Sequence, residues 1–318
     1  MNELIQHFAF SASITGPICL MILLGVVLRR FEVINDNFID VASKLVFKVT
    51  LPAMLFLSII NSTSIGTESI PLVMFGVISN TLFFLFTAFT VRFFIKDPSQ
   101  KGVVVQGGFR ANTAIIALAY VANAYGETGV AIAAVYVASL TMLYNILAVI
   151  ALTPKGENSN AKAYLGMIKS MAKNPLILSI LLALIVYTLS IPVPEIITHA
   201  GQYFANMTLP LALLCTGGSL NIRELKHDRF PNIIATGYKL ILAPLFITIT
   251  AYYFGFNNQE LGIIFFMSAA PTAAASYVMA RSMGGSATLA ANIIALTTIG
   301  SIVTCSLGIM LLSSLNLM

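Results

Sequence analysis

Apolar residues in this chain form long runs separated by short polar connections. Each run is about 20 residues long, and at about 1.5 Å per residue a helix of that length crosses the roughly 30 Å hydrocarbon core of a bilayer. The runs predict ten such helices, which cover residues 10–28, 38–60, 71–95, 103–123, 128–152, 175–192, 198–220, 231–255, 259–282 and 287–313. We therefore expect an all-α integral membrane protein.

The composition supports this prediction. The 318 residues are 58% hydrophobic and 9% charged, whereas soluble domains are about 25% charged. A net charge of +5 could suggest a nucleic-acid partner, but the basic residues lie at the ends of apolar runs, so membrane topology explains them better. The cysteines Cys19, Cys215 and Cys305 lie inside apolar runs without metal-ligand spacing, and we expect neither disulfides nor a metal site.

Basic residues collect in alternate connections. Lys and Arg follow the first, third, fifth, seventh and ninth predicted helices, whereas the intervening connections contain Glu68, Glu127, Glu195 and Glu260 and no Lys or Arg. Basic loops stay on the cytoplasmic side of a membrane. The pattern predicts a multi-pass protein of the cytoplasmic (inner) membrane with both termini outside.

The two halves of the chain share short sequence motifs that recur about 158 residues apart. Thr-Leu-Pro ends at Pro52 and again at Pro210, and Asn112-Thr113 lies opposite Pro271-Thr272. An odd number of helices in each half means that the second repeat is inverted, as in many secondary transporters. The alternative is ten helices with scattered prolines.

This repeat sets the expected domain organisation. Residues 1–155 would form the first five-helix repeat, 156–174 a polar, basic cytoplasmic linker, and 175–318 the second, inverted repeat.

Three basic residues lie deep inside predicted helices, whereas all Asp and Glu residues lie in loops or at helix ends. Arg110 lies nine residues beyond Lys101 and Lys239 nine beyond Phe230, and Lys48 lies well inside the helix 38–60, so each is roughly 12–14 Å deep. Such a side chain either extends back to the membrane surface or pairs with a backbone carbonyl, a helix C-terminus or an anionic ligand. Without a buried carboxylate, we expect no proton relay or cation site built on one.

Two predicted helices contain a break near mid-membrane. One break is the segment 106–113, with Gly107, Gly108 and an Asn-Thr pair, and the other is 268–272, with Pro271. Irregular backbone at this depth is tolerated where protein or a water-filled cavity covers it. If the breaks cross, their half-helix N-termini favour an anion. Proline kinks and close glycine packing are the alternative interpretation.

The predicted substrate site combines residues of both breaks with two further polar residues. Lys48 and Asn206 each lie four residues before the proline of the shared Thr-Leu-Pro motif. We expect them to face the same cavity, and a role in helix packing is the alternative. The candidate substrate-binding residues are Arg110, Asn112, Thr113, Pro271, Thr272, Lys48 and Asn206. The sequence has no HExxH, Walker loop or Gly-x-Ser-x-Gly motif, so we expect neither an enzyme nor a cofactor.

A set of short sequence motifs, in a specific order and spacing, gives the chain a family resemblance. They are Lys44 to Phe47 with Leu51-Pro52-Ala53, Phe109 to Thr113, Lys173 to Leu176, Leu209 to Leu213 with Gly217 to Leu220, Lys239-Leu240 with Pro244-Leu245, and Pro271 to Arg281. Over most of its length the chain resembles the auxin efflux carrier family, in its prokaryotic branch of malonate- and malate-type permeases.

The resemblance implies a fold and a mechanism. Helices 1, 2, 6 and 7 of ten would form a scaffold that dimerises, and helices 3–5 and 8–10 a transport domain that moves like an elevator. Broken helices 4 and 9 would cross in that domain, with Asn112 and Pro271 at the crossover. One departure affects helix 4, because Ala119 stands where family members commonly have proline, and its break could be milder.

These observations favour a secondary transporter for a small organic anion, in particular a carboxylate. A sodium-coupled symporter of the bile-acid type, which shares the architecture, is a second hypothesis. An anion channel or a receptor that transports nothing is a third.

Overall fold

A computed structural model describes residues 2–61, 69–153, 175–220 and 229–318 of the chain. These residues are almost entirely helical, and within them the only β-type pairing is an isolated antiparallel bridge between Ala111 and Thr272. The all-helical prediction is confirmed. The predicted linker 156–174 lies outside the described residues.

The first half of the chain contains helices at each predicted apolar run. They are α1 (Asn2–Arg30), α2 (Asp36–Leu45), the π-helical turn η1 (Val46–Thr50), α3 (Leu51–Ile60), α4 (Ser69–Phe94), α5 (Pro98–Phe109), the π-helical turn η2 (Thr113–Ala117) and α6 (Leu118–Leu152). Asn35 and Asp97 begin α2 and α5 by accepting a backbone amide on their side-chain oxygens, as N-cap residues do. Gly126 kinks α6 with a φ of 62°, which glycine adopts at little cost.

The second half contains α8 (Pro175–Thr188), α9 (Glu195–Gly218), α10 (Arg229–Gly237), the π-helical turn η4 (Tyr238–Leu242), α11 (Ala243–Tyr253), α12 (Asn258–Ala269), α13 (Ala275–Ser282) and α14 (Ala287–Ser314). Proline occupies the second position of α3 and of α11. It has no N–H to donate to the preceding turn, and in both places that turn is π-helical.

Six helical segments of the described chain are long and apolar enough to cross a membrane. They are Ile5–Arg30, Asp36–Ile60, Ile70–Phe94, Thr113–Leu152, Arg229–Tyr253 and Ala287–Ser314, and Pro175–Thr188 is a shorter apolar helix. Two predicted helices, 103–123 and 259–282, are each interrupted. The pieces α5, α12 and α13 are too short to qualify alone, whereas the second part of 103–123 belongs to the long segment Thr113–Leu152. The chain is a multi-pass membrane protein.

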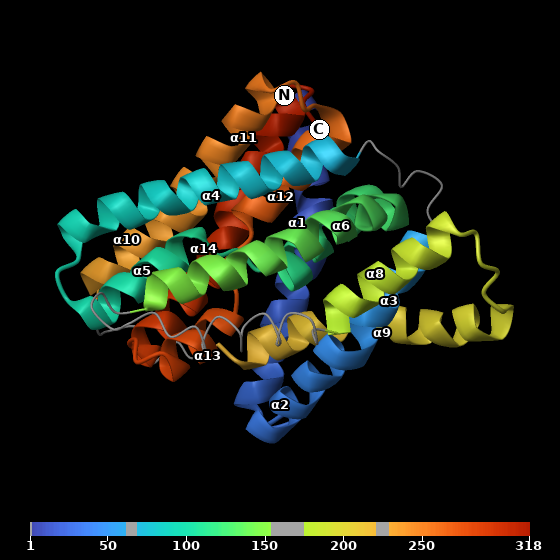
Figure 1. The fold of residues 1–318 in the computed structure, drawn as a ribbon, viewed down its shortest axis with the longest axis horizontal. Helices are drawn as coiled ribbons and strands as arrows, with labels where there is room; N and C mark the ends of the chain where they lie inside the picture. Colours follow the sequence, from blue (N-terminus) through green and yellow to red (C-terminus); the bar gives the residue numbers. More distant parts are fainter. Residues whose placement is uncertain (1, 62–68, 154–174, 221–228) are drawn as a thin grey trace.

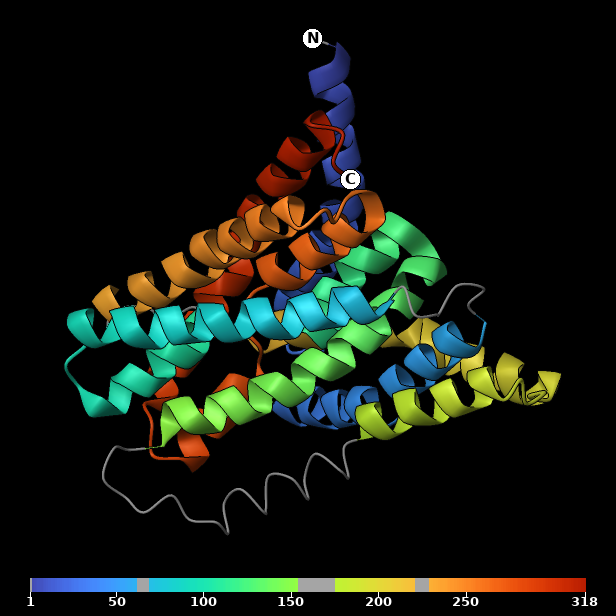
Figure 2. The same ribbon diagram turned by 45° about the horizontal axis from the view of Figure 1, so that its top comes forward.

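The helices pack in two neighbouring groups (Figures 1 and 2). In one group α9 contacts α1, α2 and α3, and α8 packs on α3; the other contains α4, α5, α6 and α10 to α14. Glycine allows the close approach of α1 to α9, since a Cβ added at Gly217 would clash with the carbonyl group of Ile22. The groups meet where α1 packs on α14 and α3 on α6, and a cavity lies between them.

Candidate functional site

The breaks in the two interrupted helices pair through their backbones. The amide of Asn112 donates to the carbonyl oxygen of Pro271 (N···O 2.7 Å), and the amide of Ala273 donates to the carbonyl of Arg110 (3.2 Å). These bonds form the bridge between Ala111 and Thr272. Both predicted breaks are present, and they meet at this bridge, which we call the crossing.

The local sequence explains where each helix stops. Ala270 takes an extended ψ of 146°, as expected for the residue before a proline. In the other segment Arg110 has a ψ of 106° and Asn112 a ψ of 70°, although no proline follows. The glycines do not make this break. Gly107 and Gly108 remain helical in α5 and allow close packing, because added Cβ atoms would lie 2.8 Å from Ile293 Cγ2 and 3.0 Å from Tyr238 Cβ.

A cavity of about 1190 Å³ lies beside the crossing. Its wall combines α2, η1 and α9 from one group of helices with the two breaks, α6, α13 and α14 from the other. Of the predicted site residues, four line it: Lys48, Arg110, Asn112 and Thr113. The new helices after each break, η2 and α13, start at its wall, so their N-terminal amides lie close to it.

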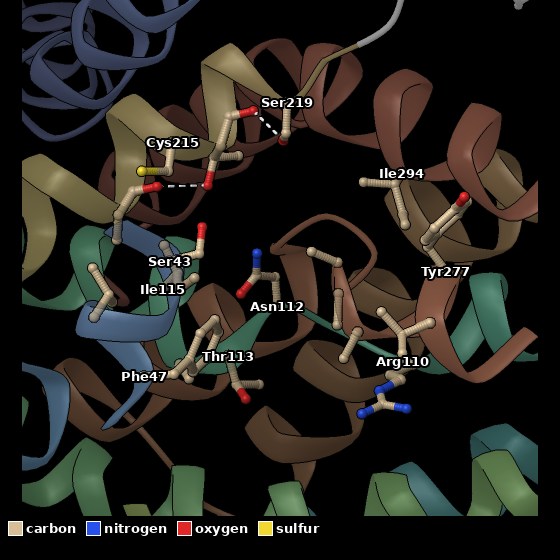
Figure 3. Close-up of a pocket in the computed structure, with 18 of the residues that line it drawn as sticks. Ser43, Phe47, Arg110, Asn112, Thr113, Ile115, Cys215, Ser219, Tyr277 and Ile294 are labelled. Carbon is tan, nitrogen blue, oxygen red and sulfur yellow. Dashed lines mark hydrogen bonds between the residues drawn. The ribbon is translucent and has the colours of Figure 1, made fainter. Parts of the chain in front are cut away.

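Asn112 is the side chain placed most directly for a ligand. It is 8% exposed, and Figure 3 shows its amide directed into the open centre of the cavity, facing the helix that carries Cys215 and Ser219. The backbone of Asn112 is held by Pro271, which leaves its amide N–H₂ and carbonyl oxygen for a ligand.

Arg110 is a buried cation with neutral partners. The residue is 6% exposed, and its guanidinium donates to Asn145 Oδ1 at 2.8 Å and to Met279 Sδ at 2.6 Å. Figure 3 shows the guanidinium directed away from the Asn112 amide. Within the described ranges the ion pair present is Arg29–Asp36, so Arg110 makes no salt bridge there.

The two interior lysines differ. Lys239 is 1% exposed, and its Nζ donates to the carbonyl oxygen of Ser268 in the last turn of α12, at 2.7 Å. It therefore pairs with a helix C-terminus and does not extend to the surface, which resolves the two alternatives that the sequence left open. Lys48 is exposed and lines the cavity.

Pro271 and Thr272 are at the crossing but not at the cavity wall. Thr272 is buried, its hydroxyl donates to the Gly107 carbonyl at 2.7 Å, and its amide donates to Thr297 Oγ1 at 3.1 Å. These two residues hold the broken helices together behind the lining.

Asn206 corrects one expectation. It lines a separate cavity of about 370 Å³, together with Asn61, Asn123, Glu127 and Gln202, and bonds to Gln202 at 2.9 Å. The prediction that Lys48 and Asn206 face the same cavity is wrong. The two residues line cavities with different walls, because Asn206 lies with residues of α3 and α6, whereas Lys48 lies with residues of α2 and the two breaks.

The sequence analysis missed Asn145 and Tyr144, which both line the main cavity. Tyr144 donates to Asn80 Oδ1 at 2.8 Å, and Asn145 holds Arg110. The signal was present, because Asn145 is an amide inside the apolar run 128–152.

Comparison with known proteins places the sequence of this chain in a protein family. A family described as "Membrane transport protein" matches residues 15–309. The chain belongs to this family. The resemblance to the auxin efflux carriers is thereby confirmed, and the protein is a membrane transporter by family.

Several relatives of this transporter match over nearly their whole length. An uncharacterized transporter of Methanothermobacter thermautotrophicus is 21% identical over 302 residues, 93% of this chain and 97% of that protein. The uncharacterized transporter MJ1031 of Methanocaldococcus jannaschii is 24% identical, covering 91% of this chain and 95% of its own. The uncharacterized transporter YfdV of Escherichia coli is also 24% identical, with 92% and 95% covered.

Proposed function

We propose that the protein is a secondary carrier that moves a small organic anion, in particular a carboxylate, across the cytoplasmic membrane. The observation that carries this proposal is the crossing itself. It presents the Asn112 amide, the start of two helices and the buried Arg110 charge at one cavity. Amide donors and helix N-termini bind carboxylates, and a buried cation attracts them strongly because the surrounding dielectric is low.

The proposal includes alternating access by an elevator-like movement. The group containing both breaks would move as a transport domain against the group formed by α1, α2, α3, α8 and α9. The main cavity and the smaller one at Asn206 lie between these groups, as access from the two sides requires. We also propose ten spans in two inverted repeats, both termini outside, and a homodimer held by the scaffold.

A sodium-coupled symporter is the closest alternative. Asn and Thr oxygens and carbonyls at the breaks could bind sodium without a carboxylate. The buried Lys239 ammonium on the Ser268 carbonyl argues against this, because it occupies a carbonyl at the crossing with a fixed cation. An anion channel or receptor has no specific support beyond the cavity.

Purified protein tests the proposal. Thermal-shift measurements with acetate, malonate, succinate and benzoate, each against its uncharged amide and with or without sodium, should find stabilisation by a carboxylate that its amide does not reproduce. Uptake of that carboxylate into liposomes should be saturable and show counterflow. Stabilisation by organic cations alone would contradict the anion assignment, and uptake without saturation would favour a channel.

A further inference from the structure

Arg110 is held in a way that is unusual for a buried cation. Buried charges are normally paired with an opposite charge. Here the guanidinium donates to two acceptors, an amide oxygen, Asn145 Oδ1 at 2.8 Å, and a thioether, Met279 Sδ at 2.6 Å. Both acceptors are neutral, so they orient the side chain without cancelling its charge.

The two acceptors come from different helices and bind different nitrogens of the guanidinium. Asn145 lies on α6 and Met279 on α13, while Arg110 itself ends α5. Three helices of the same group therefore fix the position of the cation. Figure 3 shows it directed away from the Asn112 amide, so it acts on the cavity centre through its field and not as a direct ligand.

The cavity also contains acidic residues, but they lie in a different environment. Asp36 and Asp40 line it from α2 and are exposed, and Asp36 is paired with Arg29. Exposed charges are screened by water and salt, whereas a buried charge is screened much less. Arg110 is therefore the least screened charge in the cavity wall, since Asp36, Asp40 and Lys48 are all exposed.

We propose that Asn145 is the residue that sets the charge selectivity of the carrier, because its neutral amide positions Arg110 without neutralising it. A carboxylate of the same shape at this position would form a salt bridge with Arg110. The cavity would then lose its preference for anions while keeping its form. This inference rests on the proposed function, since it explains how the anion preference arises, and it makes Asn145 a positioning residue.

The decisive variant is Asn145→Asp, which preserves shape and the hydrogen bond and adds one negative charge. Affinity for the best carboxylate of the thermal-shift series should fall at least tenfold, and affinity for its uncharged amide should change less than threefold. Asn145→Ala removes an acceptor but leaves the Arg110 charge, so carboxylate affinity should fall less than with Asn145→Asp.

A second carboxylate on the same wall of the cavity separates neutralisation of Arg110 from general repulsion of anions. Thr141 also lines the cavity, one helical turn before Asn145, and both are half-buried. Thr141→Asp adds the same charge to the same wall, and Thr141 does not hydrogen-bond to Arg110. The fold loss of carboxylate affinity in Thr141→Asp should be several times smaller than the fold loss in Asn145→Asp. If Asn145→Asp does not fold, Met279→Glu against Met279→Gln makes the same comparison from α13.

The results separate two kinds of failure. If the unaltered protein binds none of the four carboxylates, the proposed function fails, and the inference with it. If it binds a carboxylate but Asn145→Asp keeps the preference for carboxylate over amide, or Asn145→Ala is as damaging as Asn145→Asp, the function stands and the role of Asn145 is overturned. Equal losses in Asn145→Asp and Thr141→Asp also overturn it.

Discussion

The backbone amide of Asn112 donates to the carbonyl oxygen of Pro271 at 2.7 Å, and this bond joins two segments from opposite halves of the chain. Because it involves only main-chain atoms of Asn112, the side-chain amide remains free to face the cavity. Substitutions at the two positions should therefore have separable effects.

Asn112→Ala should weaken ligand binding without unfolding the protein. The backbone bond to Pro271 survives, while the ligand loses an amide partner at a cost of about 1–3 kcal/mol, or about a 5–150-fold loss of affinity. Titration of purified protein with the stabilising carboxylate measures this. Asn206→Ala is the matched control, since Asn206 lines the other cavity, and should change affinity less than threefold. A larger effect at Asn206 would move the site there.

Pro271→Ala should act on movement more than on binding. The Pro271 ring does not line the cavity, and alanine keeps the carbonyl that accepts from Asn112. Without the proline, α12 can extend past Ala270 and reshape the break. We expect liposome uptake to slow by tenfold or more, on the scale of about 1.4 kcal/mol per tenfold, with affinity changed only several-fold. Pro17→Ala, within α1, is the control, and unchanged uptake in Pro271→Ala would contradict the account.

Lys239→Met should lower stability. The Lys239 ammonium satisfies the Ser268 carbonyl at the end of α12, and leaving that carbonyl unpaired costs about 1–3 kcal/mol. The same substitution at the exposed Lys48 should hardly change thermal stability but should weaken anion binding. Thermal unfolding of the two purified variants compares them directly. Equal stability losses would mean that the Lys239 bond does not support the crossing.

Gly107→Ala should destabilise the transporter by about 1–3 kcal/mol, because the added methyl group overpacks a buried contact. Its Cβ would lie 2.8 Å from Ile293 Cγ2, and Ile293 is fully buried. Gly237→Ala is the control, since a Cβ there meets nothing within 4 Å, and alanine favours a helix by about 0.5–1 kcal/mol over glycine. Thermal unfolding should therefore move in opposite directions in the two variants.

The sequence predicted the two breaks because their causes are local. Pro271 constrains the residue before it, and Asn112-Thr113 interrupts an apolar run with polar groups. It could not decide the position of Lys239, since the partner carbonyl of Ser268 lies 29 residues away and only packing brings it near. The role of Asn145 likewise depends on Arg110, 35 residues distant.

The error about Asn206 had a geometric cause. Sequence offsets can relate positions in two repeats, but they do not tell on which side of a symmetry axis a residue lies. The repeat interpretation placed Lys48 and Asn206 together, whereas their cavities are different.

Ligand protection of an introduced cysteine tests the central claim most directly. Ala274 is exposed, begins the helix after the second break and lines the main cavity, whereas the exposed Asn206 lines the other one. In protein carrying Cys19→Ala, Cys215→Ala and Cys305→Ala, a water-soluble thiol reagent would modify Ala274→Cys or Asn206→Cys. We predict that the carboxylate slows modification at position 274 at least fivefold and leaves position 206 unchanged, and that its uncharged amide protects neither. Protection at 206 but not at 274 would contradict an anion site at the crossing.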